Sequence, residues 1–158
     1  MQHDIPGQES ARLQGKNPLA SADDAQQIQI RALYIEDDPI NRLVLRDMLG
    51  VVGISYAEGV DGPDGLAKLD SGEFDIVLLD LRMPGMDGLE VTRQIRARRD
   101  AKAGIPIVVI TADTGPGIQQ DCLKAGTQDL LLKPVAMQPL LDTICLQVLS
   151  SNPDMDMI

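Results

Sequence analysis

The chain has 158 residues, a formal net charge of −10 and an isoelectric point near 4.4. This length suits one domain with some tail, and the acidic balance argues against binding to nucleic acid or to an anionic membrane surface. The core must be mostly aliphatic, because 44% of the residues are hydrophobic and only 2% are aromatic.

The composition divides the chain into three parts. Residues 1–29 are rich in Gln, Ser, Gly, Asp and Pro and predict a disordered extension, whereas residues 151–158 predict a short frayed tail. The folded domain is expected over residues 30–150. No apolar run approaches a membrane span, and the first residues lack the order of a signal peptide. Cys122 and Cys145 lack disulfide or metal spacing, which predicts reduced, buried thiols in a cytoplasmic protein.

Strand-like and helix-like segments alternate along the domain. Runs of β-branched residues and Leu, typical of strands buried on both faces, predict strands over residues 30–36, 54–57, 74–80, 105–111 and 128–133. Helical patterns between them predict helices from Pro39 onward and over residues 63–70, 88–99, 117–125 and 137–149. Five β–α units in series imply an α/β fold, a doubly wound five-stranded parallel sheet with helices on both faces.

Two helices carry further signals. Pro39 suits a first helical turn, and Asp38 is placed to cap it. The apolar face of this helix is predicted from residues at helical spacing, namely Ile40, Leu43, Val44 and Met48. In the helix over residues 88–99, a basic cluster lies at the carboxyl end, where the helix dipole favours cations.

Polar residues end the predicted strands, and ligands of doubly wound sheets bind outside the carboxyl ends of the strands. These residues are Glu36, Asp37, Asp38, Asp80, Thr111 and Lys133. Each of them alone has an ordinary explanation, such as a helix N-terminus, a turn or a solvated strand end. Their joint occurrence at one edge predicts a site.

The charges of this edge indicate its chemistry. Carboxylates of Asp37, Asp38 and Asp80 at ~4 Å would repel by several kcal/mol at intermediate dielectric. Lys133 offsets one charge and a divalent cation two, and oxygen ligands with room for water favour Mg²⁺. Asp80 could then attack phosphorus as a nucleophile, with Lys133 and Mg²⁺ neutralising the phosphoryl oxygens and Thr111 donating a hydrogen bond. The added charge on Asp80 would draw Thr111 and Lys133 inward, as a switch.

Four sequence motifs carry a resemblance to a known family: "YIEDDPINRLVLRDML", "VLLDLRMPGMDGLEV", "PIVVITA" and "LLLKP". In this order and spacing they resemble the receiver domain of two-component response regulators, over about residues 30–150. The resemblance implies a flavodoxin-like sheet of order 2-1-3-4-5.

The resemblance also implies roles for the acidic residues. Asp80 is implied as the phosphoacceptor, and Asp37 and Asp38 as the metal-binding acidic pair. The backbone carbonyl of Arg82 would complete the protein ligands. Glu36 is interpreted as a secondary contributor that acts through water.

The resemblance further assigns Thr111 and Lys133 as switch and phosphate partners, and it predicts a cis peptide bond between Lys133 and Pro134. One position departs from the family pattern, because Leu130 stands where many members have Tyr or Phe. Either the output is read without an aromatic switch, or the coupling differs.

Two residues are expected to flank the mouth of the site. Arg82 lies two residues after Asp80, and Asp113 lies two residues after Thr111. By the family pattern such residues influence the lifetime of the phosphoryl group. The hypothesis is that Arg82 and Asp113 pair across the mouth and shield the acyl phosphate from water.

Three functions remain open at this point. The first is a phosphoacceptor module that catalyses only its own phosphorylation and dephosphorylation. Its partners would be a histidine kinase or a histidine phosphotransfer protein and a downstream protein target, without direct DNA or membrane binding; homodimerisation stays open. The second is a Mg²⁺ phosphohydrolase, disfavoured because Arg82 stands where such enzymes carry a second Asp. The third is an inert interaction domain. The motifs also resemble receivers of hybrid histidine kinases, so the chain is expected to be either free-standing or a fragment of one.

Overall fold

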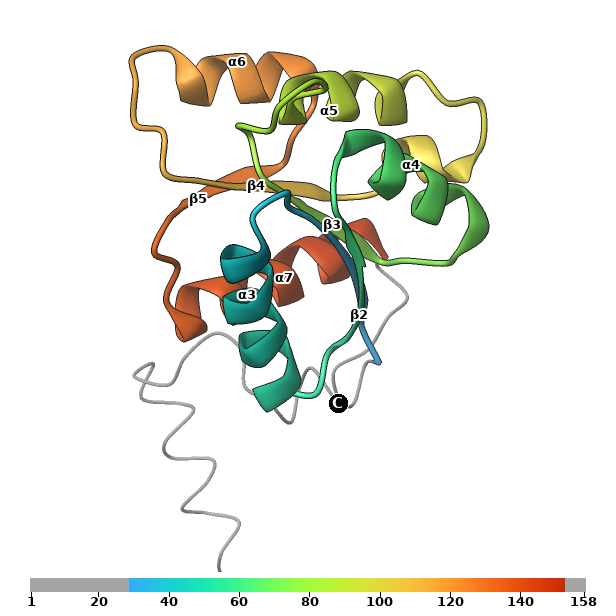
Figure 1. Ribbon diagram of the computed structural model, residues 1–158. Helices are drawn as coiled ribbons and strands as arrows, with labels where there is room; N and C mark the ends of the chain where they lie inside the picture. The colour runs from blue at the N-terminus through green and yellow to red at the C-terminus, as the bar shows by residue number, and fades with distance from the viewer. Residues whose placement is uncertain (1–28, 153–158) are drawn as a thin grey trace, which may run out of the picture.

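The computed structural model describes residues 29–152, and its centre is a parallel sheet of five strands in the order β2-β1-β3-β4-β5 (Figure 1). The strands are β1 (Arg31–Ile35), β2 (Ser55–Gly59), β3 (Ile76–Leu79), β4 (Ile107–Thr111) and β5 (Asp129–Leu132). All four neighbouring pairs are parallel. The predicted fold class and strand order are therefore confirmed. Residues 1–28 of the predicted 1–29 extension and residues 153–158 of the predicted 151–158 tail lie outside the described residues.

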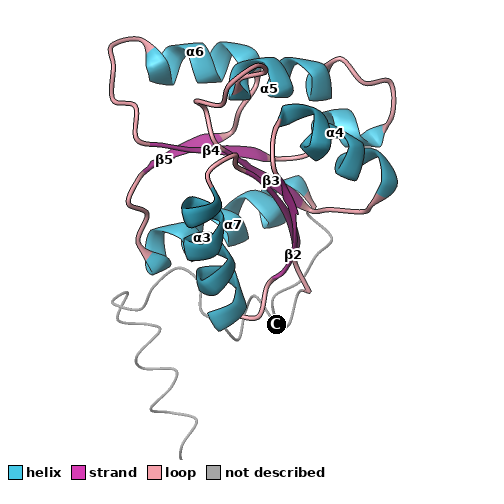
Figure 2. Cartoon of the chain, in the orientation of Figure 1, coloured by secondary structure: helices cyan, strands magenta, loops and turns pink. Residues whose placement is uncertain are grey.

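Helices cover both faces of the sheet (Figure 2). They are α3 (Pro39–Val51), α4 (Gly62–Ser71), α5 (Gly88–Arg96), α6 (Ile118–Ala125) and α7 (Met137–Ser151), with a short 3₁₀ turn, η1 (Ala101–Gly104), after α5. Helices α3 and α7 lie on one face, and α4, α5 and α6 lie on the other (Figure 1). Helix α7 runs two residues beyond its predicted end and takes in Ser151, the first residue of the predicted tail.

The strand alternation divides the core between these faces. In β1, Ala32 and Tyr34 pack with the α3 and α7 side chains, whereas Leu33 and Ile35 pack with those of α4 and α5. Successive side chains of a strand point to opposite faces, so one short apolar strand supplies both layers. This burial on both faces explains why the strands are nearly continuous apolar runs in the sequence.

The predicted apolar face of α3 is confirmed only for Met48, which packs against the core. Ile40, Leu43 and Val44 are 70%, 49% and 51% exposed, and the helix instead buries Leu45 and Leu49 against the sheet. The sequence of α3 holds two overlapping apolar stripes, and the buried one continues beyond the helix to Val52. The helix is therefore rotated away from the predicted orientation, which leaves three large apolar side chains at the surface.

Helix α5 ends earlier than predicted, at Arg96 instead of residue 99. Beyond the helix, Arg98 turns toward two carboxylates, 2.6 Å from Asp70 Oδ1 and 2.8 Å from Asp100 Oδ2. Arg98 of the basic cluster thus links Asp70 in α4 to Asp100, the residue before η1.

The prediction for the two cysteines is confirmed. Cys122 and Cys145 are free and buried. No helix between residues 29 and 152 is sufficiently long and apolar to cross a membrane.

Candidate functional site

The sheet brings the predicted residues to one edge by extending its ladder to their backbones. Glu36 N–H donates to Gly59 O at 3.0 Å, and Asp80 N–H donates to Ile35 O at 3.0 Å. At the other side, Lys133 N–H donates to Thr111 O at 2.9 Å. The carboxyl ends of β1, β3, β4 and β5 are therefore aligned, and the side chains that follow them share one edge.

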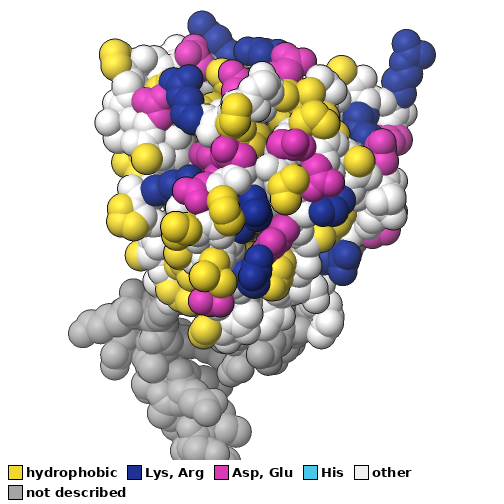
Figure 3. All heavy atoms as spheres, in the orientation of Figure 1, with side chains coloured by type: hydrophobic (Ala, Val, Ile, Leu, Met, Phe, Trp, Pro, Cys, Tyr) yellow, Lys and Arg dark blue, Asp and Glu magenta, His cyan; other side chains and the backbone are white. Residues whose placement is uncertain are grey.

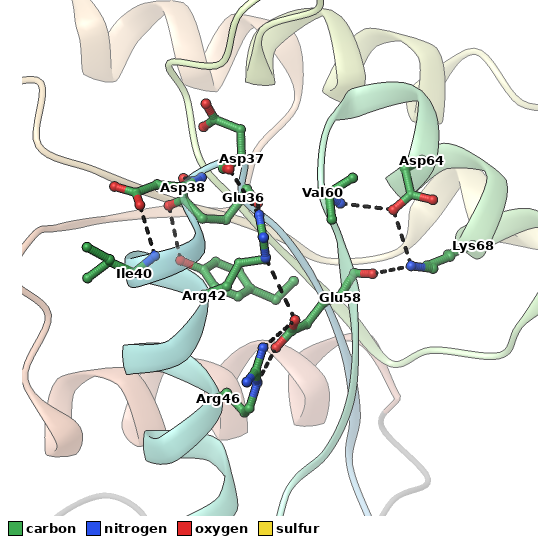
Figure 4. A network of polar contacts seen from close by, with 11 residues as sticks. Glu36, Asp37, Asp38, Ile40, Arg42, Arg46, Glu58, Val60, Asp64 and Lys68 are labelled. Atoms are coloured by element: carbon green, nitrogen blue, oxygen red, sulfur yellow. Dashed lines mark hydrogen bonds and ion pairs between the residues drawn. The ribbon is translucent and has the colours of Figure 1, made fainter.

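Three carboxylates gather at this edge, from Glu36, Asp37 and Asp80, with one oxygen from each lying within 4.8 Å of the others. This corrects the predicted acidic pair, because Asp38 is replaced by Glu36. Asp38 is the N-cap of α3, and its Oδ1 accepts the Ile40 N–H at 2.9 Å (Figure 4). Pro39 at the first helical position was the signal for this, since the residue before it directs its side chain back to the helix.

Glu36 is the most enclosed of the three carboxylates, with no exposed surface. Its Oε1 accepts hydrogen bonds from Lys133 Nζ at 2.7 Å and from the Tyr34 hydroxyl at 3.2 Å. Its Oε2 accepts the Asp38 N–H at 3.1 Å. Burial raises the pKa of Glu36, but the bonds from Lys133 and the Asp38 N–H outweigh burial and leave this pKa lowered. Glu36 is thus a buried member of the carboxylate cluster whose lowered pKa favours its ionised form. Its expected role as a contributor that acts through water stays a prediction.

Asp80 lies at the end of β3 and is only 6% exposed. Burial, followed by the negative charge of Glu36, raises the pKa of Asp80 to about 6, although Lys133 opposes this. Lys133 Nζ lies 3.4 Å from Asp80 Oδ1, so one ammonium serves two carboxylates. Burial lowers the pKa of Lys133, but its bonds to Glu36 and the charge of Asp80 more than reverse this and hold it protonated.

The residues around this cluster fill the predicted positions. Thr111 is buried at the end of β4, and its Oγ1 accepts the Asp113 N–H at 3.1 Å. The Lys133–Pro134 bond is cis, as predicted. Leu130 is half-buried on β5, opposite Val109, where it packs against a small apolar cluster.

The predicted pair of Arg82 and Asp113 is confirmed. Arg82 Nε donates to Asp113 Oδ2 at 2.7 Å, and Arg82 Nη2 donates to the same oxygen. The Gly115 N–H and the Arg82 guanidinium lower the pKa of Asp113. The pair spans the loops that follow β3 and β4. Its effect on phosphate lifetime and the ligand role of the Arg82 carbonyl stay predictions.

Glycine allows the loop after β3 to close on the site. A Cβ on Gly88 would lie 2.5 Å from Asp80 O, so only glycine lets the start of α5 approach the backbone of Asp80 this closely. Gly85 has φ of +82°, a left-handed conformation that glycine favours.

Residues 32–145 match the family described as the response regulator receiver domain. The chain belongs to this family. The match covers most of the chain and includes every site residue described above. This receiver is therefore a module of two-component signalling.

Its curated relatives are large kinases. The sensor histidine kinase RcsC of Escherichia coli is 36% identical over 132 residues, which cover 82% of this chain and 14% of that protein. The hybrid signal transduction histidine kinase L of Dictyostelium discoideum is 36% identical over 130 residues, 76% of this chain and 8% of that protein. The receiver thus spans a small fraction of the length of these relatives.

Solved structures share the fold. The chemotaxis protein CheY4 of Vibrio cholerae has a TM-score of 0.70 at 27% identity, covering 75% of this chain and 98% of that chain. The receiver domain of the sensor histidine kinase PA1611 from Pseudomonas aeruginosa has a TM-score of 0.69 at 31% identity, covering 75% and 97%, and has a magnesium ion coordinated in its active site cleft. The receiver of Ssk1 from Saccharomyces cerevisiae, in complex with the phosphotransfer protein Ypd1, has a TM-score of 0.70 at 27% identity, covering 82% and 96%.

The raised pKa of Asp80 predicts that the free energy of unfolding depends on pH. The folded-state pKa is about 6 and the ordinary value is 3.8, so between these values the folded protein binds more protons at Asp80 than the unfolded chain does. The protein therefore loses stability as pH rises from about 4 to 6. We expect Asp80→Asn to be more stable than wild type above pH 6 by ~1–3 kcal/mol, and the gain to vanish near pH 4. Urea denaturation in chelator-containing buffer measures this. The exposed Asp47→Asn is the control, and a gain that is equal at pH 4 and pH 7 would contradict the assignment.

Proposed function

We propose that this receiver accepts a phosphoryl group from a phosphohistidine onto Asp80 and that the modification switches its binding to a partner protein. The observation that supports this most strongly is the arrangement around Asp80. A buried carboxylate lies beside two others, and an ammonium lies 3.4 Å from its oxygen. A nucleophile for phosphorus and a cation for the phosphoryl oxygens are thus side by side.

Magnesium fits the donor set. Glu36, Asp37 and Asp80 provide carboxylate oxygens, which hard divalent cations prefer, and Lys133 leaves most of their negative charge uncompensated. These residues would hold Mg²⁺, with the Arg82 carbonyl as a further ligand. When bound, the ion would supply positive charge to the transferring phosphoryl oxygens.

The residues of the chain define the transfer step. An Asp80 oxygen attacks phosphorus, a P–O bond forms, and the P–N bond to the donor imidazole breaks. The imidazole nitrogen keeps the electron pair and takes a proton. Lys133 pairs with a phosphoryl oxygen, and the Thr111 hydroxyl donates to another. Lys133 and Thr111 thereby change partners, which is the local event of the switch.

The exposed side chains of α3 support a place for the phosphodonor. Ile40, Leu43 and Val44 follow the acidic turn directly, and apolar side chains gather on the visible surface over α3 (Figure 3). A donor histidine must reach Asp80, so its protein must cover the rim of the site. We propose that the surface of Ile40, Leu43 and Val44 receives a histidine kinase or a histidine phosphotransfer protein.

Other functions have less support. Mg²⁺ phosphohydrolases with an Asp nucleophile on a similar sheet typically carry a second Asp two residues after it, and that position holds Arg82, whose guanidinium is bound to Asp113. We therefore propose that the receiver catalyses only its own phosphorylation and dephosphorylation. The family membership and the kinase relatives favour this role, whether the receiver acts alone or within a longer kinase.

Labelling with a small phosphodonor tests the proposal. Acetyl phosphate or phosphoramidate with Mg²⁺ should add one phosphoryl group to the wild type, measured by intact mass. Asp80→Asn should remain unlabelled, and Asp47→Asn should label as the wild type does. Absence of label on the wild type would favour an inert interaction domain, and repeated turnover of a phosphoester would favour a hydrolase.

The proposed docking surface predicts a difference between donors. Val44→Gln should slow transfer from a phosphorylated kinase or phosphotransfer protein by roughly fivefold or more, because it places an amide in an apolar contact. Labelling by acetyl phosphate should be unchanged. Val51→Gln is a matched control, since Val51 is also exposed but lies at the far end of α3. Equal transfer rates to both variants would exclude this surface.

The pair of Arg82 and Asp113 predicts a change in phosphate lifetime. Arg82→Ala opens the mouth of the site to water without supplying a general base, so we expect dephosphorylation to be faster by about two- to tenfold, less than the ~10²-fold or more of a positioned general base. The decay of radiolabelled protein measures the rate. Arg93→Ala, which removes an exposed ion pair with Glu90, is the control. An unchanged lifetime in Arg82→Ala would refute the shielding hypothesis.

A further inference from the structure

The acidic turn between β1 and α3 has an unusual set of backbone partners. All three of its carbonyls, those of Glu36, Asp37 and Asp38, accept hydrogen bonds from Arg42. Arg42 Nη1 donates to Glu36 O at 2.7 Å and to Asp37 O at 3.0 Å, and the Arg42 N–H donates to Asp38 O at 3.0 Å. One residue of α3 therefore closes the turn that carries two of the clustered carboxylates.

Arg42 is itself held firmly. Its side chain is only 15% exposed, and its Nε lies 3.8 Å from Glu58 Oε1 on β2. The next basic residue along α3, Arg46, binds both oxygens of Glu58, at 2.8 and 2.9 Å. In Figure 4 the Arg42 side chain lies between the acidic turn and Glu58. The guanidinium thus has one fixed position, with the turn on one side and β2 on the other.

The choice of carbonyls distinguishes Arg42 from the other buried cation of the site. Lys133 binds the carboxylate oxygens of Glu36 and approaches that of Asp80, so it occupies atoms that a metal ion needs. Arg42 binds backbone oxygens of the turn, which leaves the carboxylate oxygens available. A contact of this kind orients metal ligands without competing for them.

We propose that Arg42 is a positioning residue for cation binding, which holds the Glu36 and Asp37 backbone so that their carboxylates meet Asp80. The inference rests on the proposed function, because it assumes that this cluster binds Mg²⁺. The positive charge of Arg42 has the opposite effect on a divalent cation, but Glu58 partly offsets it. Loss of the positioning contact would weaken Mg²⁺ binding, whereas loss of the positive charge would strengthen it. The direction in which the Mg²⁺ affinity changes on substitution therefore shows which effect is larger.

Magnesium titration of the unphosphorylated protein by calorimetry tests this proposal. We expect Arg42→Met to weaken Mg²⁺ binding by about tenfold, as loss of a ligand-orienting contact typically does. Arg42→Lys keeps the charge and one nitrogen for the two carbonyls, but it loses the rigid guanidinium plane and the approach of Nε to Glu58, so its affinity should lie between those of Arg42→Met and the wild type. Arg46→Met should bind Mg²⁺ as the wild type does, because Arg46 contacts Glu58 and not the turn.

A second readout excludes a merely structural effect. In acetyl phosphate labelling, the loss in Arg42→Met should appear in the Mg²⁺ concentration for half-maximal rate more than in the limiting rate. Arg42→Met and Arg46→Met should also be compared by thermal denaturation in chelator, and a stability loss shared by both would not account for an affinity loss in one.

The outcomes separate this inference from the proposed function. If the wild type does not bind Mg²⁺, the metal assignment fails. If the wild type binds and Arg42→Met binds equally well or more tightly, only the role of Arg42 is overturned. An equal loss in Arg42→Met and Arg46→Met would also overturn it, since the effect would then belong to the Glu58 network as a whole.

Discussion

The structure depends on the enclosure of like charges at one edge of a sheet. Glu36, Asp37 and Asp80 bring carboxylate oxygens within 4.8 Å of one another, and two of these residues are buried. Such an arrangement is unfavourable unless cations or donors offset it. The surrounding contacts follow from this need: Lys133 spans two carboxylates, the Tyr34 hydroxyl donates to Glu36 Oε1, and the Asp38 N–H donates to Glu36 Oε2. The compensation is incomplete, because Lys133 supplies one positive charge against three carboxylates, and the proposed cation and phosphoryl chemistry rests on this imbalance.

The sheet is what makes this enclosure achievable. Parallel strands bring their carboxyl ends to the same edge, and buried apolar runs on both faces keep those ends in register. The longer side chain of Glu36 reaches Lys133, which comes from a strand at the far end of the sheet, 97 residues along the chain. The ion pair therefore ties β1 to β5 through the middle of the site. If phosphorylation of Asp80 draws Lys133 away from Glu36, as the proposed function implies, this ion pair changes and the end of β5 is affected.

The sequence predicted the architecture well because each strand is a distinct apolar run ending in a polar residue. It placed Asp80, Thr111 and Lys133 correctly for that reason, since the carboxyl end of each strand is marked by its own residue. It failed where two solutions fit the same local pattern. Three consecutive acidic residues contain two adjacent pairs, and the sequence of α3 contains two apolar stripes. Which pair joins the site and which stripe is buried depend on tertiary packing, which the local residue pattern does not determine. Both choices are linked to the N-cap of α3. Asp38 accepts the Ile40 N–H as the cap, and the helix that begins there buries Leu45 and Leu49.

The position of Leu130 shows how the site can communicate without an aromatic ring. Leu130 lies opposite Val109 on β4 and packs with Leu81, which follows Asp80 directly, and with Cys122 on α6. The cluster thus connects the residue after the nucleophile, the strand that ends in Thr111 and the helix beyond it. Under the proposed function, Thr111 and Lys133 would move toward a phosphoryl group and shift the ends of β4 and β5, on which these aliphatic side chains pack. Close packing would carry such a shift onward, because interiors at crystal-like density do not absorb displacements locally. The packing of Leu130 therefore offers a contact path from the end of β3 to α6 that requires no aromatic ring.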